Sequence, residues 1–475
     1  MNPLKKNIGV IAGLGAVFFG LLASGFLLRG GGSPDPVGFE RATCLDVVED
    51  EGVVHLLFGL PSGDEEVSMA FFHTRSEDGG RSWTESVRLP VTHAVPGRHH
   101  RSNDPQLAVA GDRLIAVWTA QGDGPWGSGP LGTAVSNDGG ETWRPGPAPE
   151  IGGDSGETGF RFPAVAADES AFHAVWIHAR GDERSLRHSR LMFDTDRWSN
   201  PVVVDPHICA CCWNRLEVAG DGKLVALYRD KNPSDMAMAM SADGGRTWER
   251  LGHVGPFDWR FDGCPHVGGG LAAGQGGNAG TVLASVWSGH PGHAGAYIMR
   301  SDDFAKSWRP ACPTSEVIRP GRNTDMVLID GDFAAVAWDQ PAENGKPAVF
   351  YAVSTDGGET WGDSTRLSPT GERATHPRLA VSSDRILVLW SGEGRDGRLR
   401  LRAETLQFTE VINQAIAGDE RSGRNEGEIE SALRDSGSGG EQREPPTAPC
   451  CDECAQPCLL TRLNADRKRQ PRGQV

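Results

Sequence analysis

The stretch of sequence that decides the fold is SEDGGRSW, residues 76–83. The same pattern, Ser-x-Asp-x-Gly-x-(Ser/Thr)-Trp, recurs at residues 136–143, 241–248 and 354–361, and a fifth copy at 301–308 has Ala305 in place of the glycine. An aspartate in this position can accept hydrogen bonds from nearby backbone amides, and the glycines supply positive φ. Each copy therefore predicts a tight hairpin turn whose tryptophan packs under the next repeat.

A second landmark recurs with the first. A short apolar strand that ends in a bulky aromatic residue appears about every 50 to 60 residues, at Phe58, Trp118, Trp176, Tyr228, Trp287, Trp338 and Trp390. Most of these strands follow another strand and a turn, as 105–109 and Gly111-Asp112 precede Trp118. This period is typical of the four-stranded blades of a β-propeller. The sequence therefore predicts an all-β, seven-bladed propeller, with six blades as the alternative.

These repeats resemble the Asp-box repeats of the sialidase superfamily, and the motif is called the Asp-box below. The resemblance covers residues 37–408 and implies a sialidase-like β-propeller. In that superfamily the motif is structural, and it also occurs in propellers that are not sialidases. A fold does not imply a function, so the resemblance indicates architecture and favours a non-sialidase relative.

The segments that flank the propeller differ from it in composition. Lys5 and Lys6 precede an apolar, uncharged run at 8–28, long enough for a transmembrane helix with its lysines in the cytoplasm. Residues 1–29 are therefore expected to be a membrane anchor, or a signal peptide if they are cleaved. Residues 30–36 are predicted to form a linker, and residues 37–410 are predicted to form the propeller. Either reading places the propeller outside the cytoplasm, in the periplasm or the extracellular space, and cleavage would make it a secreted protein.

The C-terminal part is expected to lack a packed core. Residues 411–449 are rich in Glu, Arg, Ser and Gly and predict a disordered linker. Residues 450–475 form a basic tail that begins with a second thiol cluster, Cys450, Cys451, Cys454 and Cys458. The formal net charge of −16 for the whole chain argues against nucleic acid as a partner.

Charged and polar side chains, cysteines and histidines gather where the inner strands of the blades are expected to begin. This is the mouth of the central channel. The candidates at these positions are His99, His100, Arg101, Asn103, Asp104, Arg161, Cys209, Cys211, Cys212, Cys264, His266, Arg322, Asn323, Asp325 and His376. The expected ligand at this mouth is a glycan, a metal or a protein.

The first hypothesis for the mouth is a metal site. Cys209, Cys211 and Cys212 precede one inner strand, and Cys264 and His266 precede the next. Thiolates with an imidazole suit copper or zinc. Disulfide bonding is the alternative, because the compartment is oxidising and ten cysteines are an even number.

The second hypothesis is an exo-glycosidase of the sialidase type. The resemblance implies three arginines that hold a carboxylate, for which Arg101, Arg161 and Arg322 are the candidates, and an acid/base aspartate, for which Asp104 and Asp325 are the candidates. It also implies a tyrosine nucleophile, whereas the chain's three tyrosines, Tyr228, Tyr297 and Tyr351, fall on later strands. The third hypothesis is a non-catalytic assembly scaffold for a membrane complex. The preferred hypothesis is a ligand-binding propeller whose cysteine-bearing mouth binds a metal or carries disulfide bonds, with hydrolysis second, and whether the protein is an enzyme stays open.

Overall fold

The computed structural model describes residues 41–62, 68–91, 96, 101–149, 158–311, 318, 320–329, 332–342, 345–382, 385–394 and 397–408. The predicted anchor at 1–29, the linkers at 30–36 and 411–449, the C-terminal tail, His99 and His100 lie outside these ranges. Within them, no helix is long and apolar enough to cross a membrane.

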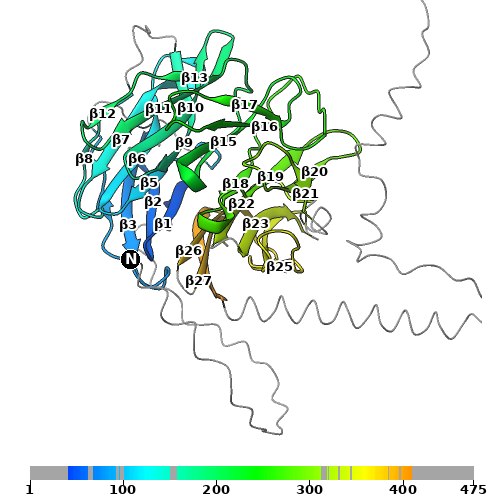
Figure 1. The fold of residues 1–475 in the computed structure, drawn as a ribbon. Coiled ribbons are helices and arrows are strands. Elements are labelled where there is room, and N and C mark those ends of the chain that lie inside the picture. The colour runs from blue at the N-terminus through cyan, green and yellow to red at the C-terminus, as the bar shows by residue number, and fades with distance from the viewer. Residues whose placement is uncertain are drawn as a thin grey trace, which may run out of the picture. The chain divides into compact units, whose positions relative to one another are not determined.

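Seven antiparallel sheets form the blades (Figure 1). Blade 1 contains β1 (Cys44–Asp50), β2 (Val53–Ser62), β3 (Ser68–Ser76) and β4 (Val87–Arg88), and blade 2 contains β5 (Gln106–Ala110), β6 (Arg113–Gln121), β7 (Ser128–Ser136) and β8 (Arg144–Pro145). Blade 3 contains β9 (Thr158–Ala167), β10 (Ala171–Arg180), β11 (Glu183–Met192) and β12 (Arg197–Trp198), and β13 (Val202–Asp205) also pairs with β11.

The remaining blades repeat this order. Blade 4 contains β14 (Arg215–Ala219), β15 (Lys223–Arg229), β16 (Met236–Ser241) and β17 (Glu249–His253), and blade 5 contains β18 (Gly270–Ala273), β19 (Val282–Ser288), β20 (Gly295–Ser301) and β21 (Arg309–Pro310). Blade 6 contains β22 (Thr324–Ile329), β23 (Phe333–Pro341), β24 (Pro347–Ser354) and β25 (Thr365–Arg366), and blade 7 contains β26 (Ala374–Ser382), β27 (Arg385–Glu393) and β28 (Leu399–Gln407). Three short 3-10 turns, η3 (Pro125–Gly127), η4 (Gly220–Gly222) and η5 (Gly276–Asn278), complete the described elements.

The first strands of the seven blades close a ring. Each contacts the first strand of the next blade, from β1 through β5, β9, β14, β18 and β22 to β26, and β26 contacts β1 again. Figure 1 shows this closure where the blue first blade meets the orange last blade. The prediction of a seven-bladed all-β propeller is thus confirmed.

The hydrophobic core is divided among the spaces between adjacent blades. One cluster of buried apolar side chains fills each of the seven spaces within the described residues. The aromatic landmarks lie on the second strand of each blade, and Phe58, Trp118, Trp176 and Trp338 are almost completely buried. Full burial of such a side chain contributes about 1.5–3 kcal/mol, so the repeated strand pattern is also the repeated source of stability.

The Asp-boxes form the turns between the third and fourth strands of their blades. In the first copy, the Asp78 carboxylate accepts hydrogen bonds from the Ser82 amide (2.8 Å) and hydroxyl (2.6 Å), and the Ser76 hydroxyl accepts one from the Gly80 amide (2.7 Å). Gly80 has a φ of +89°. In the degenerate copy Ala305 takes the same left-handed conformation, at a φ of +65°.

The packing direction of the Asp-box tryptophans differs from the prediction. Trp143 of blade 2 contacts His73 of blade 1, with ring centroids 5.2 Å apart, and Trp248 of blade 4 contacts His188 of blade 3 at 5.1 Å. The expectation that the tryptophan packs under the next blade was therefore wrong, because the outer part of each twisted sheet leans over the preceding blade.

Buried histidine pairs support two of these turns from below. His55 Nδ1 lies 3.1 Å from His73 Nε2, and His73 Nδ1 lies 3.3 Å from the Gly140 carbonyl oxygen of the second Asp-box. His173 and His188 repeat the arrangement in blade 3, with ring nitrogens 3.2 Å apart. Burial lowers the pKa of His55 to about 4 and that of His73 to about 3, so both rings are neutral at physiological pH.

Candidate functional site

The inner strands begin with strained backbone at the mouth of the channel. Ser102, Phe162, His266 and His376 all have positive φ, between +51° and +91°; Phe162 and His376 lie within the first strands of their blades, and the other two shortly before theirs. Non-glycine residues rarely adopt this conformation, and such residues cluster at functional sites. The strained residues therefore mark the mouth as a candidate functional site.

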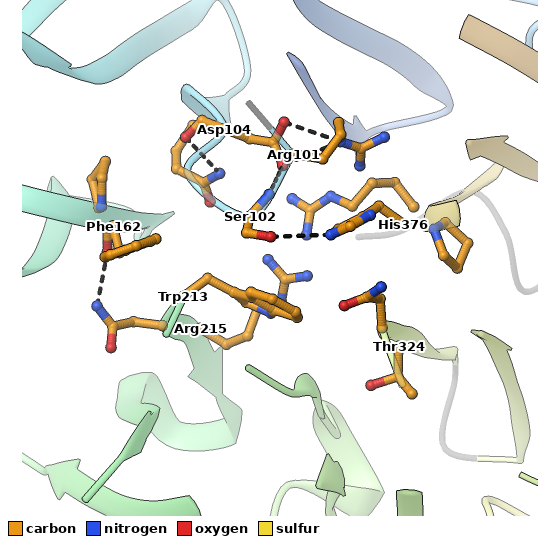
Figure 2. Close-up of a pocket in the computed structure, with 14 residues that line it drawn as sticks. Arg101, Ser102, Asp104, Phe162, Trp213, Arg215, Thr324 and His376 are labelled. Carbon is orange, nitrogen blue, oxygen red and sulfur yellow. Dashed lines mark hydrogen bonds and ion pairs between the residues drawn. The ribbon is translucent and has the colours of Figure 1, made fainter. Parts of the chain in front are cut away.

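A hollow that is open to solvent lies between these strand starts. Figure 2 shows the side chains of five blades that converge on it, among them Arg101, Trp213 and His376. The Ser102 hydroxyl lies 3.0 Å from His376 Nε2, and Arg101 Nε lies 3.1 Å from an Asp104 carboxylate oxygen. Of the predicted mouth residues, the hollow brings together Arg101, Asp104, Asn323 and His376.

Arginines around this hollow are paired with carboxylates. Arg215 lies 3.0 Å from Asp325, and Arg378 lies 3.5 Å from Asp325 and also pairs with Asp46. The pKa of Arg378 is raised, since these carboxylates outweigh the effect of burial. Such pairs leave little positive charge free to hold the carboxylate of a ligand.

Of the residues proposed for sialidase chemistry, Arg101 and Asp104 line the hollow, whereas Arg161, Arg322 and Asp325 do not. Arg101 lines the hollow, whereas the Arg161 guanidinium lies over Trp126, 4.9 Å from the ring centroid, and Arg322 donates a hydrogen bond to the Pro265 carbonyl oxygen at 3.3 Å. None of the three tyrosines, all of which lie within the described residues, lines the hollow; they belong to β15, β20 and β24. Asp104 and Asp325 are each engaged in an ion pair with an arginine.

The cysteine motif lies directly behind one wall of the hollow. Cys209, Cys211 and Cys212 precede Trp213, and all three are buried. The Cys209 amide donates to the Arg229 carbonyl oxygen at 3.0 Å, which holds the segment against the end of β15. Cys209 Sγ lies 3.7 Å from Cys211 Sγ. A tetrahedral site with metal–sulfur bonds of about 2.3 Å has sulfur–sulfur edges of about 3.8 Å, so this spacing suits a shared metal ion.

The second cysteine segment meets the first at Cys211. The potential ligand atoms of Cys209, Cys211 and Cys212 all lie within 4.8 Å of one another, and so do those of Cys211, Cys264 and His266. The first set is buried, whereas Cys264 and His266 are exposed. The structure thus gathers the five residues that the sequence pointed to into two sets joined by one sulfur atom. All five cysteines in the described part of the chain, Cys44 included, are free thiols.

Two arginines act electrostatically on these sulfur atoms. The buried Arg229 donates to the carbonyl oxygens of Val267, Ser234 and Trp287 at 2.6–3.0 Å. Arg229 also acts electrostatically on Cys212, and Arg161 interacts with Cys211 and Cys264. Two cations therefore act electrostatically on the cluster.

The three buried thiols share protons unequally. Burial raises the pKa of Cys212. Hydrogen bonds with Cys209 and Cys211 and the charge of Arg229 lower the same pKa by more than burial raises it, so the net shift is downward. The pKa of Cys209 is raised to about 11: the hydrogen bond with Cys211 lowers it, and the bond with Cys212 together with burial outweighs that effect. Such an environment concentrates thiolate character on one sulfur atom.

Several residues of the site were not anticipated. Arg215 and Arg378 line the hollow from inner strands, the buried Asp46 pairs with Arg378, and Arg229 lies at the end of β15. A charged residue within an apolar strand, as at Arg229 after Leu227-Tyr228, is the signal that could have revealed the last of these.

Comparisons with known proteins agree with the fold. No protein-family model and no curated protein matches the sequence. Among solved structures, the chain is similar to the Hadza microbial sialidase Hz136, at 16% identity and a TM-score of 0.44 over 75% of this chain and 76% of that one. It is also similar to a mutant Trypanosoma rangeli sialidase that displays trans-sialidase activity, at 12% identity and a TM-score of 0.45, over 81% of this chain and 57% of that one.

A third similar structure is an ulvan lyase of polysaccharide lyase family PL25, bound to a GlcA–Rha3S saccharide. It has 10% identity and a TM-score of 0.50, over 80% of this chain and 99% of that one. At 10% identity the likeness to the lyase concerns the fold alone.

Proposed function

We propose that this protein is a metal-binding β-propeller that holds copper or zinc through Cys209, Cys211, Cys212, Cys264 and His266. The observation that carries the proposal is the convergence of these residues into two compact sets of soft ligand atoms. Their segments come from neighbouring blade connections, β13 to β14 and β17 to β18, so the framework positions them before any ion binds. Thiolate and imidazole together favour copper(I) or zinc(II) over hard cations.

The experiment must separate this site from the C-terminal thiols. The parent protein is the full chain in which serine replaces Cys450, Cys451, Cys454 and Cys458. After reduction and loading with copper(I) or zinc(II) without oxygen, elemental analysis should find tightly bound metal in the parent. A Cys211→Ser/Cys212→Ser variant should lose it.

Cys44→Ser is the matched control, because Cys44 is also buried but belongs to neither set of ligand atoms. This control should retain the metal of the parent. Absence of metal from the parent, or equal metal in the parent and the Cys211→Ser/Cys212→Ser variant, would refute the proposal.

A second candidate function is glycan binding or exo-glycosidase action at the hollow. It is favoured by the polar side chains around Trp213, because aromatic faces with hydrogen-bonding neighbours suit sugars, and by the similar structures whose names include sialidases and a polysaccharide lyase. Fluorogenic glycosides, including a sialoside, test it. Turnover that disappears in Asp104→Asn and in Arg161→Ala would support a hydrolase. A non-catalytic scaffold for a membrane complex is the function left if both the metal and the glycan tests fail.

We also propose that the propeller acts outside the cytoplasm, tethered by residues 1–29 and followed by a linker at 411–449 and the thiol-bearing tail. The support is the uncharged run at 8–28 after Lys5 and Lys6. Alkaline extraction should leave the chain in the membrane pellet. A soluble chain that begins after residue 29 would indicate a cleaved signal peptide instead.

A further inference from the structure

The five ligand residues do not surround a single point. Two trios of ligand atoms, each spread over no more than 4.8 Å, have only the Sγ atom of Cys211 in common. One four-coordinate zinc ion would need four of the five donors in one compact set. The arrangement instead provides two three-donor sets that share a thiolate, and a thiolate can bridge two soft metal ions.

We propose that the site holds two copper(I) ions bridged by Cys211, an inference that rests on the proposed metal-binding function. The inner ion is bound by Cys209, Cys211 and Cys212, and the outer ion by Cys211, Cys264 and His266. Copper(I) is the soft ion that three donors satisfy, whereas zinc(II) takes four.

Charge around the cluster is compatible with this occupancy. Arg229 acts electrostatically on Cys212, and Arg161 interacts with Cys211 and Cys264. These two cations offset the negative charge that four thiolates keep after two copper(I) ions have bound. A single zinc(II) ion would be balanced equally well, so the separation of the donors into two sets is the feature that favours two ions.

Burial differs between the two sets and gives the ions different accessibility. Cys209, Cys211 and Cys212 are no more than 6% exposed, whereas Cys264 and His266 lie at the surface. A chelator or a partner protein with soft ligands can therefore reach the outer ion directly. The inner ion is released only when the buried segment opens. The outer position is accordingly the exchangeable one.

The test is an anaerobic titration of the parent protein with copper(I), followed by competition with bicinchoninate. We expect two copper ions per chain, one removed rapidly and one removed slowly. Cys264→Ser should leave one ion that is removed slowly. His266→Asn should do the same, and asparagine is chosen because it tolerates the positive φ of +52° at this position. Both residues are exposed, so neither change should disturb the core.

Cys211→Ser should abolish the bridged pair and leave no slowly released ion, and Cys44→Ser should behave as the parent. One copper per chain in the parent, unchanged by Cys264→Ser and His266→Asn, would overturn the two-ion inference while leaving metal binding by the buried cysteines intact. Two ions released at the same rate would overturn the assignment of an exchangeable outer site. A parent that binds neither copper nor zinc would overturn the proposed function itself.

Discussion

Acidification should destabilise the propeller through the histidine pair His55 and His73, by about 4 kcal/mol between pH 7.5 and pH 5. Both rings are buried in the folded protein, and their pKa values are lowered from 6.5 to about 4 and about 3. In the unfolded chain both bind a proton near pH 6.5. The unfolded state therefore gains protons first as the pH falls, and the folded state loses stability.

The magnitude follows from the size of the shifts. At pH 5 an unfolded histidine is stabilised by protonation by about 2 kcal/mol relative to pH 7.5, while the folded rings stay largely neutral. The contribution is complete above pH 6.5 and is lost as the pH falls toward the folded values. Two rings give about 4 kcal/mol.

Urea unfolding at both pH values measures the effect. A His55→Gln/His73→Gln variant keeps polar side chains in the pair but cannot titrate, so it should lose about 4 kcal/mol less than the native chain on acidification, whatever its stability at pH 7.5. His253→Gln is the control, because the hydrogen bond with Asp230 raises the pKa of His253, and its stabilisation is lost as the pH rises instead. An equal acid-induced loss in the double variant and the native chain would refute the reasoning.

Two further predictions concern the Asp-boxes. Gly140→Ala should cost at least about 3 kcal/mol, because the new Cβ would overlap the His73 ring in addition to the strain at positive φ. Gly111→Ala, with open space around the new Cβ, should cost only about 1 kcal/mol. Similar urea midpoints for the two variants would contradict this prediction. Asp243→Ala removes an acceptor of backbone hydrogen bonds and should cost about 1–2 kcal/mol, whereas Asp302→Ala breaks the ion pairs of a half-exposed carboxylate with Arg300 and Arg309 and should cost under about 1 kcal/mol. Equal losses at these two aspartates would show that the turn does not depend on its carboxylate.

The architecture could be predicted because its signals are local and repeated. The Asp-box turn forms when an aspartate lies next to backbone amides of the same turn. The landmark aromatics are recognised from the two-residue alternation of a single strand. Each repeat can therefore be recognised from its own residues. The direction in which Trp143 packs could not be found in this way, because it depends on how the twist of one sheet carries its outer strands over its neighbour.

The candidate site could be predicted where its residues occupy equivalent positions in the repeats. Cys211 and Cys264 could be matched because both precede inner strands of neighbouring blades, and the structure brings their sulfur atoms together. The division into two sets could not be foreseen, because it depends on side-chain directions across two connections. The ion pair of Arg378 with Asp46 joins the last blade to the first, which are distant in the sequence, so spacing carried no sign of it.

The central claim is that the cysteine-bearing mouth binds a metal ion through sulfur. X-ray absorption at the copper or zinc edge of the metal-loaded parent protein tests this claim most directly, because it reports the atoms bound to the metal. The account predicts a first shell dominated by sulfur, at about 2.3 Å, that is lost with the metal in Cys211→Ser/Cys212→Ser. A shell of only nitrogen and oxygen, or a sulfur shell that persists in that variant, would contradict it.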